Sequence, residues 1–386
     1  DDLGRLGRVD SRVRLSYAQW PMPFSSRASG LPVVDLTESN PTAVGLAYPE
    51  AEILAALADA RTLRYEPDPA GLPEAREAVA RYYRDRGVSV DPSAVLLTAS
   101  TSEAYAAAFK LLCDPGDRVL VPEPSYPLFG FLAGLEGVEV APYPLRLEEH
   151  WRFDLAAVRR AAVAGSTRAV VVVSPNNPTG SCLERDDLAA LVDVARTHEL
   201  ALVCDEVFAD YAFGDDPERV VSTAAEPGVL TLTLSGLSKV AALPQLKLGW
   251  IVLSGPGRTV RAARERLEVI LDTYLSVNTP VQHAAARLLD LRHPIQRVLR
   301  ERVAANRDRL VQALGPRVLH ADAGWYAVIE TPGRREQQLV VHLVCDHGVH
   351  VHPGYFFDFP REAFVVVSLI VRPETLEAAL PALAGA

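Results

Sequence analysis

The chain has 386 residues, which exceeds the usual size of one compact core, so we expect a large lobe and a smaller one. Hydrophobic residues make up 49% of the sequence and charged residues 23%, a composition that excludes a disordered chain. The net charge of −10 argues against nonspecific binding to nucleic acid or to an anionic membrane, and no apolar run is long enough to span a bilayer.

The first two thirds of the chain predict an α/β fold. The N-terminal residues predict irregular structure with a short strand and turn over 35–42, followed by helices over 49–60 and 72–86. From residue 95 onward, short apolar strands alternate with helices. The predicted strands cover 95–98, 118–121, 138–143, 169–173, 201–204, 230–234 and 249–253, and the helices between them cover 99–113, 155–164 and 188–198. This alternation predicts a mainly parallel central sheet with helices on both faces.

The remaining residues predict a smaller α+β lobe. A long helical stretch over 257–289 breaks near Asn278-Thr279-Pro280, and further helices are predicted over 294–314 and 374–383. The strands expected here cover 324–330, 350–352 and 364–369. We therefore expect an N-terminal segment over 1–48 that packs with the small domain, a large domain over 49–270 and a small domain over 271–386.

Cysteine and histidine spacing predicts neither a disulfide framework nor a metal site. The four cysteines form no CxxC pair, which favours reduced thiols in a cytoplasmic protein, and the chain begins without a signal peptide. His347, His350 and His352 lie close together in the sequence, but no further cysteine or carboxylate stands at ligand spacing. We expect His350 and His352 to share one face of a strand and to bind no metal.

Lysine is rare in this chain. Only Lys110, Lys239 and Lys247 occur among the 39 basic residues, and arginine supplies the remaining positive charge. Lysine, unlike arginine, can lose its proton and act as an amine nucleophile. Each lysine has the alternative of ordinary solvation, but Lys239 and Lys247 lie in one short segment, which favours a shared function.

Polar residues follow four of the predicted strands, at the positions where ligands collect in an open parallel sheet. Ser100-Thr101-Ser102 opens a helix, where free backbone N–H groups favour a phosphate; the alternative is an ordinary helix cap. Asn177 lies in the loop Ser174-Pro175-Asn176-Asn177-Pro178-Thr179-Gly180, whose prolines restrict its conformations and whose amides direct hydrogen bonds.

An acid and an amine follow the next two strands. Asp205-Glu206 comes directly after an apolar strand, where a carboxylate can keep a ring nitrogen protonated; the alternative is a helix cap. Lys239 follows a glycine-containing turn and suits imine formation with an aldehyde. Phosphate cradle, amide, acid and amine together match the needs of pyridoxal 5′-phosphate.

These motifs, in this order and spacing, resemble those of the class I/II aminotransferases, the fold-type-I pyridoxal-phosphate enzymes, over nearly the whole chain. The resemblance implies that Lys239 forms the Schiff base with the cofactor and then moves the proton, that Asp205 pairs with the pyridinium nitrogen, and that Asn177 donates to the phenolic oxygen. It also implies a substrate-binding role for Asn177. The residues implied to stack on the ring or hold the phosphate are Tyr126, Ser100, Thr101, Ser102 and Ser238.

The resemblance also implies a homodimer with shared active sites. Tyr65 matches a tyrosine that reaches the phosphate of the neighbouring subunit. Ser39 stands where the backbone approaches the substrate carboxylate, and Tyr355 is a further candidate for the substrate pocket, together with Trp20, Trp325 and Tyr326. As aromatic residues, these four also suit a core or an interface.

Three positions depart from the family pattern. Phe208 replaces a tyrosine that donates to the phenolic oxygen, and Lys247 replaces a phosphate-binding arginine without its two-pronged geometry. Val366 stands where an arginine usually clamps the substrate carboxylate. Arg372 lies four residues beyond Ser368 and is expected to point elsewhere, so the possible substitutes are Arg12, Arg14 and Arg27.

The resemblance therefore predicts a ping-pong aminotransferase that acts on an amino acid and a 2-oxo acid. A second possibility is elimination, cyclisation or oxidation of an amino acid with the same cofactor. A third is a ligand-sensing domain of a transcription regulator, although the segment ahead of the first motif is too short for a DNA-binding domain.

Overall fold

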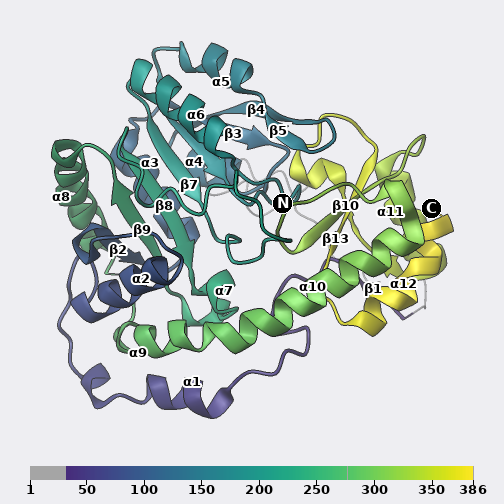
Figure 1. Cartoon of the computed structure of the whole chain (residues 1–386), viewed down its shortest axis with the longest axis horizontal. Coiled ribbons are helices and arrows are strands. Elements are labelled where there is room, and N and C mark those ends of the chain that lie inside the picture. Colours follow the sequence, from purple (N-terminus) through teal and green to yellow (C-terminus); the bar gives the residue numbers. More distant parts are fainter. Residues whose placement is uncertain (1–31, 276, 386) are drawn as a thin grey trace, which may run out of the picture.

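The computed structural model describes residues 32–275 and 277–385. Figure 1 shows a large lobe built around a central sheet and a smaller lobe beside it, with the long helix α10 (Arg292–Leu314) running from one to the other. None of the described helices is both long and apolar enough to cross a membrane.

The central sheet has eight strands in the order β2-β9-β8-β7-β6-β3-β4-β5. Their bounds are β2 (Val95–Thr98), β3 (Arg118–Glu123), β4 (Glu139–Leu147), β5 (Trp151–Phe153), β6 (Thr167–Val173), β7 (Ala201–Asp205), β8 (Thr231–Gly236) and β9 (Gly249–Ser254). The pairs from β8 through β4 are parallel, whereas β9 runs antiparallel to both of its neighbours and β5 to β4. The prediction of a mainly parallel sheet is confirmed.

Helices cover both faces of this sheet. The helices of the large lobe are α1 (Glu50–Leu57), α2 (Pro73–Asp85), α3 (Thr101–Leu112), α4 (Phe129–Leu135), α5 (Leu155–Ala162), α6 (Arg185–Thr197), α7 (Leu237–Val240), α8 (Gly257–Tyr274) and α9 (Thr279–Asp290). Val170 and Val172 of β6 pack in one apolar cluster with α5 and α6, and Val171 and Val173 pack in another with α3 and α8. Successive strand residues point to opposite faces, so burial on both faces explains the unbroken apolar run of β6.

The small lobe contains a three-stranded antiparallel sheet in the order β10-β13-β12. Its elements after α10 are β10 (Tyr326–Glu330), α11 (Glu336–His347), β11 (Val349–His350), β12 (His352–Pro353), β13 (Phe364–Ser368) and α12 (Pro373–Gly385). Strand β1 (Val34–Asp35) pairs in parallel with β11, so this part of the N-terminal segment packs on the small lobe. The boundary at residue 270 stays a prediction, since Val281 and Leu288 of α9 pack with α2 in the large lobe.

The structure adds three helices that the sequence analysis missed and divides one predicted strand. Helices α4, α7 and α11 lie in stretches that were assigned no helix. The strand predicted over 350–352 is wrong as a single element, because His350 belongs to β11, which pairs with β1, and His352 belongs to β12, which pairs with β13. His350 forms an ion pair with Asp35, and the His352 ring contacts Phe357 instead.

Candidate active site

A cavity of about 290 Å³ opens at the carboxyl ends of the parallel strands. It brings together most of the site residues that the sequence predicts. These are Ser39, Ser100, Thr101, Ser102, Tyr126, Asn177, Asp205, Phe208, Ser238, Lys239 and Lys247. Tyr65 and Tyr355 do not line it.

The register of the sheet explains why the phosphate motif and the lysine meet. Thr98 of β2 and Gly236 of β8 both pair with Gly249 of the intervening strand β9, so Ser100 and Lys239 leave the sheet on either side of that glycine. A Cβ atom on Gly249 would lie 2.9 Å from the carbonyl carbon of Ser100. A residue without a side chain is therefore required where the two strand ends converge.

Asp205 ends β7, between β6 and β8, and faces the cavity. Its Oδ1 accepts the backbone N–H of Val207 at 3.0 Å, and its Oδ2 accepts the Tyr105 hydroxyl at 3.1 Å. Burial raises the pKa of Asp205 to about 6, although these hydrogen bonds and the charge of Lys239 oppose the rise. The sequence analysis missed Tyr105, which lies on α3 four residues after Thr101 and so on the same helix face.

Glu206, the other half of the acid pair, points away from this site. Its carboxylate accepts hydrogen bonds from the hydroxyl of Ser222 and from the backbone N–H and hydroxyl of Thr223. The two acids therefore have different roles: Asp205 faces the cavity, and Glu206 joins β7 to the 222–223 segment.

Lys239 places its amine between two aromatic rings. Nζ lies 5.7 Å from the centre of the Phe208 ring and 5.4 Å from that of Trp325. Burial lowers the pKa of Lys239, while the Asp205 carboxylate favours the charged form. An amine that loses its proton more readily is a better nucleophile, so this environment suits covalent chemistry at Nζ.

Three side chains fix the backbone that carries Lys239. The Tyr211 hydroxyl donates to the carbonyl oxygen of Lys239 at 2.7 Å, Gln296 Nε2 donates to that of Val240 at 2.7 Å, and the Tyr48 hydroxyl donates to that of Ala242 at 2.8 Å. These donors come from three distant parts of the sequence, and no local motif predicts them. They hold the turn that carries Lys239 through its backbone carbonyl oxygens and form no hydrogen bond with the amine.

Asn177 and Tyr326 form the opposite wall. Asn177 is buried, and its Oδ1 has no hydrogen-bond partner among the described residues. The Tyr326 hydroxyl interacts with the side chains of Ser39 and Asn177, and burial raises the pKa of Tyr326 to about 12. The sequence analysis considered Tyr326 only as a pocket aromatic, and the structure places its hydroxyl beside the amide.

The start of α3 combines a helix cap with the cavity wall. The Ser100 hydroxyl caps the helix by accepting the backbone N–H of Glu103 at 3.1 Å, and the Glu103 carboxylate accepts the N–H of Ala99, the residue before the cap. The capping alternative thus holds for the Ser100 hydroxyl, whereas Thr101 and Ser102 remain partly exposed at the cavity.

The three residues that depart from the family pattern lie in different parts of the structure. Phe208 and Lys247 line the cavity, with Lys247 in the left-handed backbone region at φ 54°. Val366 is buried inside β13, and the guanidinium of Arg372 lies against Gly45. No arginine of residues 32–275 and 277–385 lines the cavity, and Arg12, Arg14, Arg27 and Trp20 fall outside those residues.

The two remaining predicted residues lie at the surface. Tyr65 is 75% exposed, in the segment after the 3₁₀ turn η2 (Ala60–Leu63), and Tyr355 lies half-exposed in the turn η6 (Gly354–Phe357). An exposed Tyr65 is compatible with a contact to a second subunit, and that contact stays a prediction.

Comparison with known proteins identifies the family. The family "Aminotransferase class I and II" matches residues 32–383. The chain belongs to this family. It is 32% identical over 256 residues to the glutamate-pyruvate aminotransferase AlaA of Escherichia coli, a match that covers 66% of this chain and 63% of that protein, and thus less than two thirds of the relative. The alanine aminotransferase of Mycobacterium tuberculosis is 30% identical over 350 residues, which cover 86% of this chain and 80% of that protein.

Solved structures of other aminotransferases superimpose on nearly the whole chain. The alanine aminotransferase of Pyrococcus furiosus gives a TM-score of 0.82 at 26% identity and covers 92% of each chain. A double mutant of the aspartate aminotransferase of Thermus thermophilus gives 0.83 at 27% identity, covering 99% of this chain and 98% of that one. The fold is therefore that of the fold-type-I aminotransferases, as the resemblance implied, and the family implies dependence on pyridoxal phosphate.

Proposed function

We propose that this protein is a pyridoxal-phosphate-dependent aminotransferase that moves an amino group between an amino acid and a 2-oxo acid by a ping-pong mechanism. The observation that carries the proposal is the joint placement of the Lys239 amine, the Asp205 carboxylate and the Asn177 amide in one cavity. Its residues supply an amine, an acid, an amide and hydroxyl donors, and these are the groups that this cofactor needs.

The donor set fits the cofactor in detail. Thr101, Ser102 and Ser238 would hold its phosphate at the start of α3, with Lys247 as the neutralising cation. The Asn177 amide would donate to its phenolic oxygen, and the exposed ring of Tyr126 would stack on its ring. Oδ1 of Asn177, which has no partner among the described residues, is left to accept a hydrogen bond from a ligand.

When bound, the cofactor supplies an aldehyde for condensation with amines and a ring that withdraws electrons. Asp205 would accept a hydrogen bond from the ring nitrogen, and Tyr105 and Val207 orient its carboxylate for that contact. Burial lowers the pKa of Lys239, so Nζ releases its proton more readily than an exposed lysine does, which suits a general base and acid. The hydrogen bond from Tyr211 to the carbonyl oxygen of Lys239 holds the backbone in place, so that Nζ would stay directed into the cavity while it transfers the proton.

The names of the relatives support the substrate class. They describe transfer between glutamate and pyruvate or reaction of alanine, so we infer small-molecule amino acids and 2-oxo acids as substrates. The exposure of Tyr65 supports a homodimer in which each subunit completes the other's site. Four free cysteines support a cytoplasmic location.

The test is a half-reaction with the purified holoenzyme and single amino acids. Transamination predicts that the visible absorbance of the bound cofactor is lost on adding an amino acid and returns on adding a 2-oxo acid, with the amino group recovered in the new amino acid. The variant Lys239→Ala is expected to lose this activity while keeping its fold by circular dichroism. Turnover by that variant at the wild-type rate would refute the role of Lys239.

One observation favours a second candidate function. Val366 and the absence of a lining arginine among residues 32–275 and 277–385 leave the usual carboxylate clamp unfilled there. This suits elimination, cyclisation or oxidation of an amino acid with the same cofactor. Release of ammonia or consumption of oxygen without a reversible half-reaction would select this candidate.

A further inference from the structure

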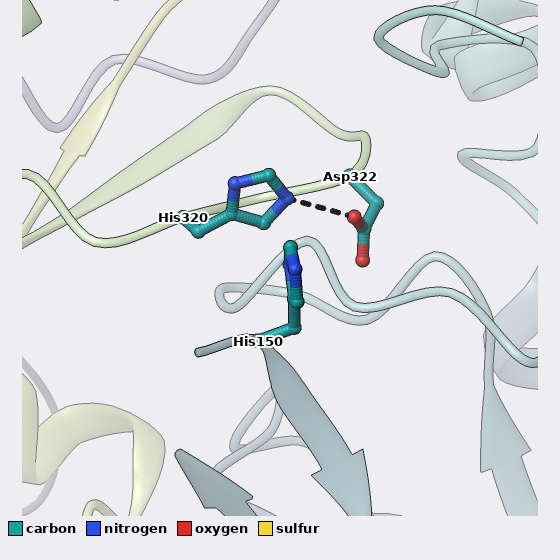
Figure 2. Close-up of side chains that lie close together, drawn as sticks. All are labelled: His150, His320 and Asp322. Carbon is teal, nitrogen blue, oxygen red and sulfur yellow. Dashed lines mark hydrogen bonds and ion pairs between the residues drawn. The ribbon is translucent and has the colours of Figure 1, made fainter. Parts of the chain in front are cut away.

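Two histidines and an aspartate from separate parts of the chain meet outside the active-site cavity. His150 lies in the loop between β4 and β5 of the large lobe, and His320 and Asp322 lie in the segment that precedes β10 of the small lobe. One ligand atom from each residue lies within 4.8 Å of the other two. Figure 2 shows His320 and Asp322 side by side on one segment, with His150 reaching toward them from another.

The three side chains are arranged around a common point. The rings of His150 and His320 are perpendicular, with centres 4.2 Å apart, and Nε2 of His320 lies 2.9 Å from Oδ1 of Asp322. Nδ1 of His150 is fully shielded from solvent and has no hydrogen-bond partner among the described residues. A buried nitrogen without a partner is costly, so its position beside two further ligand groups points to a missing binding partner.

We propose that His150, His320 and Asp322 bind one divalent transition-metal ion, with Zn²⁺ as the best match. Two imidazole nitrogens and a carboxylate form a set that Zn²⁺ favours, whereas Mg²⁺ and Ca²⁺ prefer oxygen ligands alone. Three protein ligands leave a fourth tetrahedral position for water.

The spacing requires only a small adjustment. Ligands at about 2.1 Å from a tetrahedral ion lie roughly 3.4 Å apart, and the ligand atoms here lie within 4.8 Å of one another, so the widest pair must close by up to about 1.4 Å. His320 is exposed, so a change of its rotamer would not disturb the core. The neighbouring cation Arg152 forms an ion pair with Glu184, which leaves the Asp322 carboxylate available to the metal.

A metal at this position would brace the wall of the active site. The backbone N–H groups of Asp322 and Ala323 both donate to the carbonyl oxygen of Gly180 at 3.1 Å, and Gly180 ends the loop that carries Asn177. The ion would therefore tie the β4–β5 loop of the large lobe to the small-lobe segment that supports this loop. The expected function is structural: the metal would hold the two lobes together beside the cavity.

The test measures metal binding directly, with holoenzyme that carries no affinity tag and from which free cofactor has been removed. After equilibrium dialysis against Zn²⁺, we expect one tightly bound ion per chain. Removal of even an outer-shell partner costs roughly 10- to 100-fold in metal affinity, so His150→Ala and His320→Ala are each expected to weaken binding by more than about 100-fold. Asp322→Asn is expected to weaken it as well.

The chain contains a matched control on α11. His342 also pairs with an aspartate, Asp346, at 2.5 Å, and its ring lies 5.1 Å from that of His347, but these residues do not form a metal-ligand group. His342→Ala should therefore bind Zn²⁺ like the wild type. Zn²⁺ should raise the thermal midpoint of the wild type and of His342→Ala but not that of His320→Ala, whose exposed side chain is not needed for folding.

Two results would overturn the proposal: a wild type that retains no Zn²⁺ after dialysis, or a His320→Ala variant that retains as much as the wild type. Both readouts are independent of turnover, so they leave the proposed aminotransferase activity untouched.

Discussion

The buried carboxylate of Asp205 lowers the stability of the folded apoprotein in a pH-dependent way, and bound cofactor should remove this cost. Burial raises its pKa from an ordinary value of 3.8 to about 6, so the folded apoprotein binds this proton more tightly than the unfolded chain does. The penalty is absent below pH 3.8, develops as the pH rises toward about 6 and is constant above that value. The substitution Asp205→Asn removes the ionisation and with it this pH dependence.

The difference between the folded and unfolded pKa values of Asp205 sets the size of this free-energy cost. One pKa unit corresponds to about 1.4 kcal/mol, so the ionised carboxylate costs the apoprotein at most about 3 kcal/mol at neutral pH. The cost is an upper bound, because the carboxylate faces the cavity, where water screens it. Asparagine can still accept one of the two hydrogen bonds from Tyr105 and Val207, so loss of the other reduces the net gain by about 1 kcal/mol.

The assay is urea denaturation of the cofactor-free proteins across pH 4 to 8. We expect the free energy of unfolding of the apo Asp205→Asn variant to rise relative to that of the wild type as the pH rises. The difference should reach up to about 2 kcal/mol after the lost hydrogen bond is subtracted. Cofactor should stabilise the wild type much more than the variant, since only a carboxylate can pair with a protonated ring nitrogen. The variant should also lose turnover.

The substitution Asp35→Asn provides a control that should show no pH trend of its own between pH 4 and 8, because its titration lies below that range. Although burial alone would raise it, hydrogen bonds from His350 and Thr37 lower the pKa of Asp35 to about 2. Its ionised form therefore stabilises the fold above pH 3.8, and that stabilisation is lost as the pH falls toward 2. A stability difference between wild type and Asp205→Asn that is the same at pH 4 and pH 8 would refute the reasoning about Asp205.

The remaining predictions concern the cavity walls and its charge. Gly249→Ala should cost about 1–3 kcal/mol and weaken cofactor binding, because the new methyl group meets the Ser100 backbone; Gly130→Ala, which meets no atom within 4 Å, is the control in denaturation and cofactor titrations. Tyr326→Phe should lower kcat/KM by roughly two- to tenfold through the lost contact with Asn177, and unchanged kinetics would contradict this role. Tyr65→Phe should weaken cofactor binding in a dimer without changing thermal stability, and equal cofactor affinity would argue against a shared site. Without a lining arginine, an amino acid should be preferred over its decarboxylated amine by no more than roughly 10- to 150-fold in kcat/KM, the worth of one charge-assisted hydrogen bond; a ratio far above this would mean that a guanidinium outside the described residues reaches the carboxylate.

The chemical centre could be predicted from the sequence because its parts follow strand ends. Asn177, Asp205 and Lys239 each come directly after a short apolar strand, and parallel strands bring their carboxyl ends to one edge of the sheet. The local pattern therefore predicted the shared location of these residues, and their chemical roles stay a prediction. The strand β9, which separates β2 from β8, did not disturb this arrangement, because it reverses direction between two strands that run the same way.

The supporting contacts could not be predicted in this way. Tyr105 reaches Asp205 across 100 positions of sequence, and Tyr48 reaches the lysine-bearing turn across 194. Such contacts depend on how helices pack on the sheet. In the sequence, a buried tyrosine that donates a hydrogen bond cannot be told from an ordinary core residue. The small lobe was harder for the same reason: β11 and β12 are two residues each and are defined by different partner strands, which a run of histidines does not reveal.

The residues of the chemical centre could be predicted and the residues that support them could not, and the physical reason for this difference also bears on substrate specificity. Residues that touch the cofactor are constrained by chemistry common to many reactions, so their types recur at strand ends. Residues that choose a substrate need only complement its shape and charge, and in the proposed arrangement Ser39 and Tyr326, which line the cavity, would be among them. The cavity contains two lysines among its described lining residues, and both are engaged by the cofactor in the proposed arrangement. Within that lining, a substrate carboxylate would have to be held by hydroxyl, amide and backbone dipoles, which makes its recognition depend on the precise positions of Ser39 and Asn177.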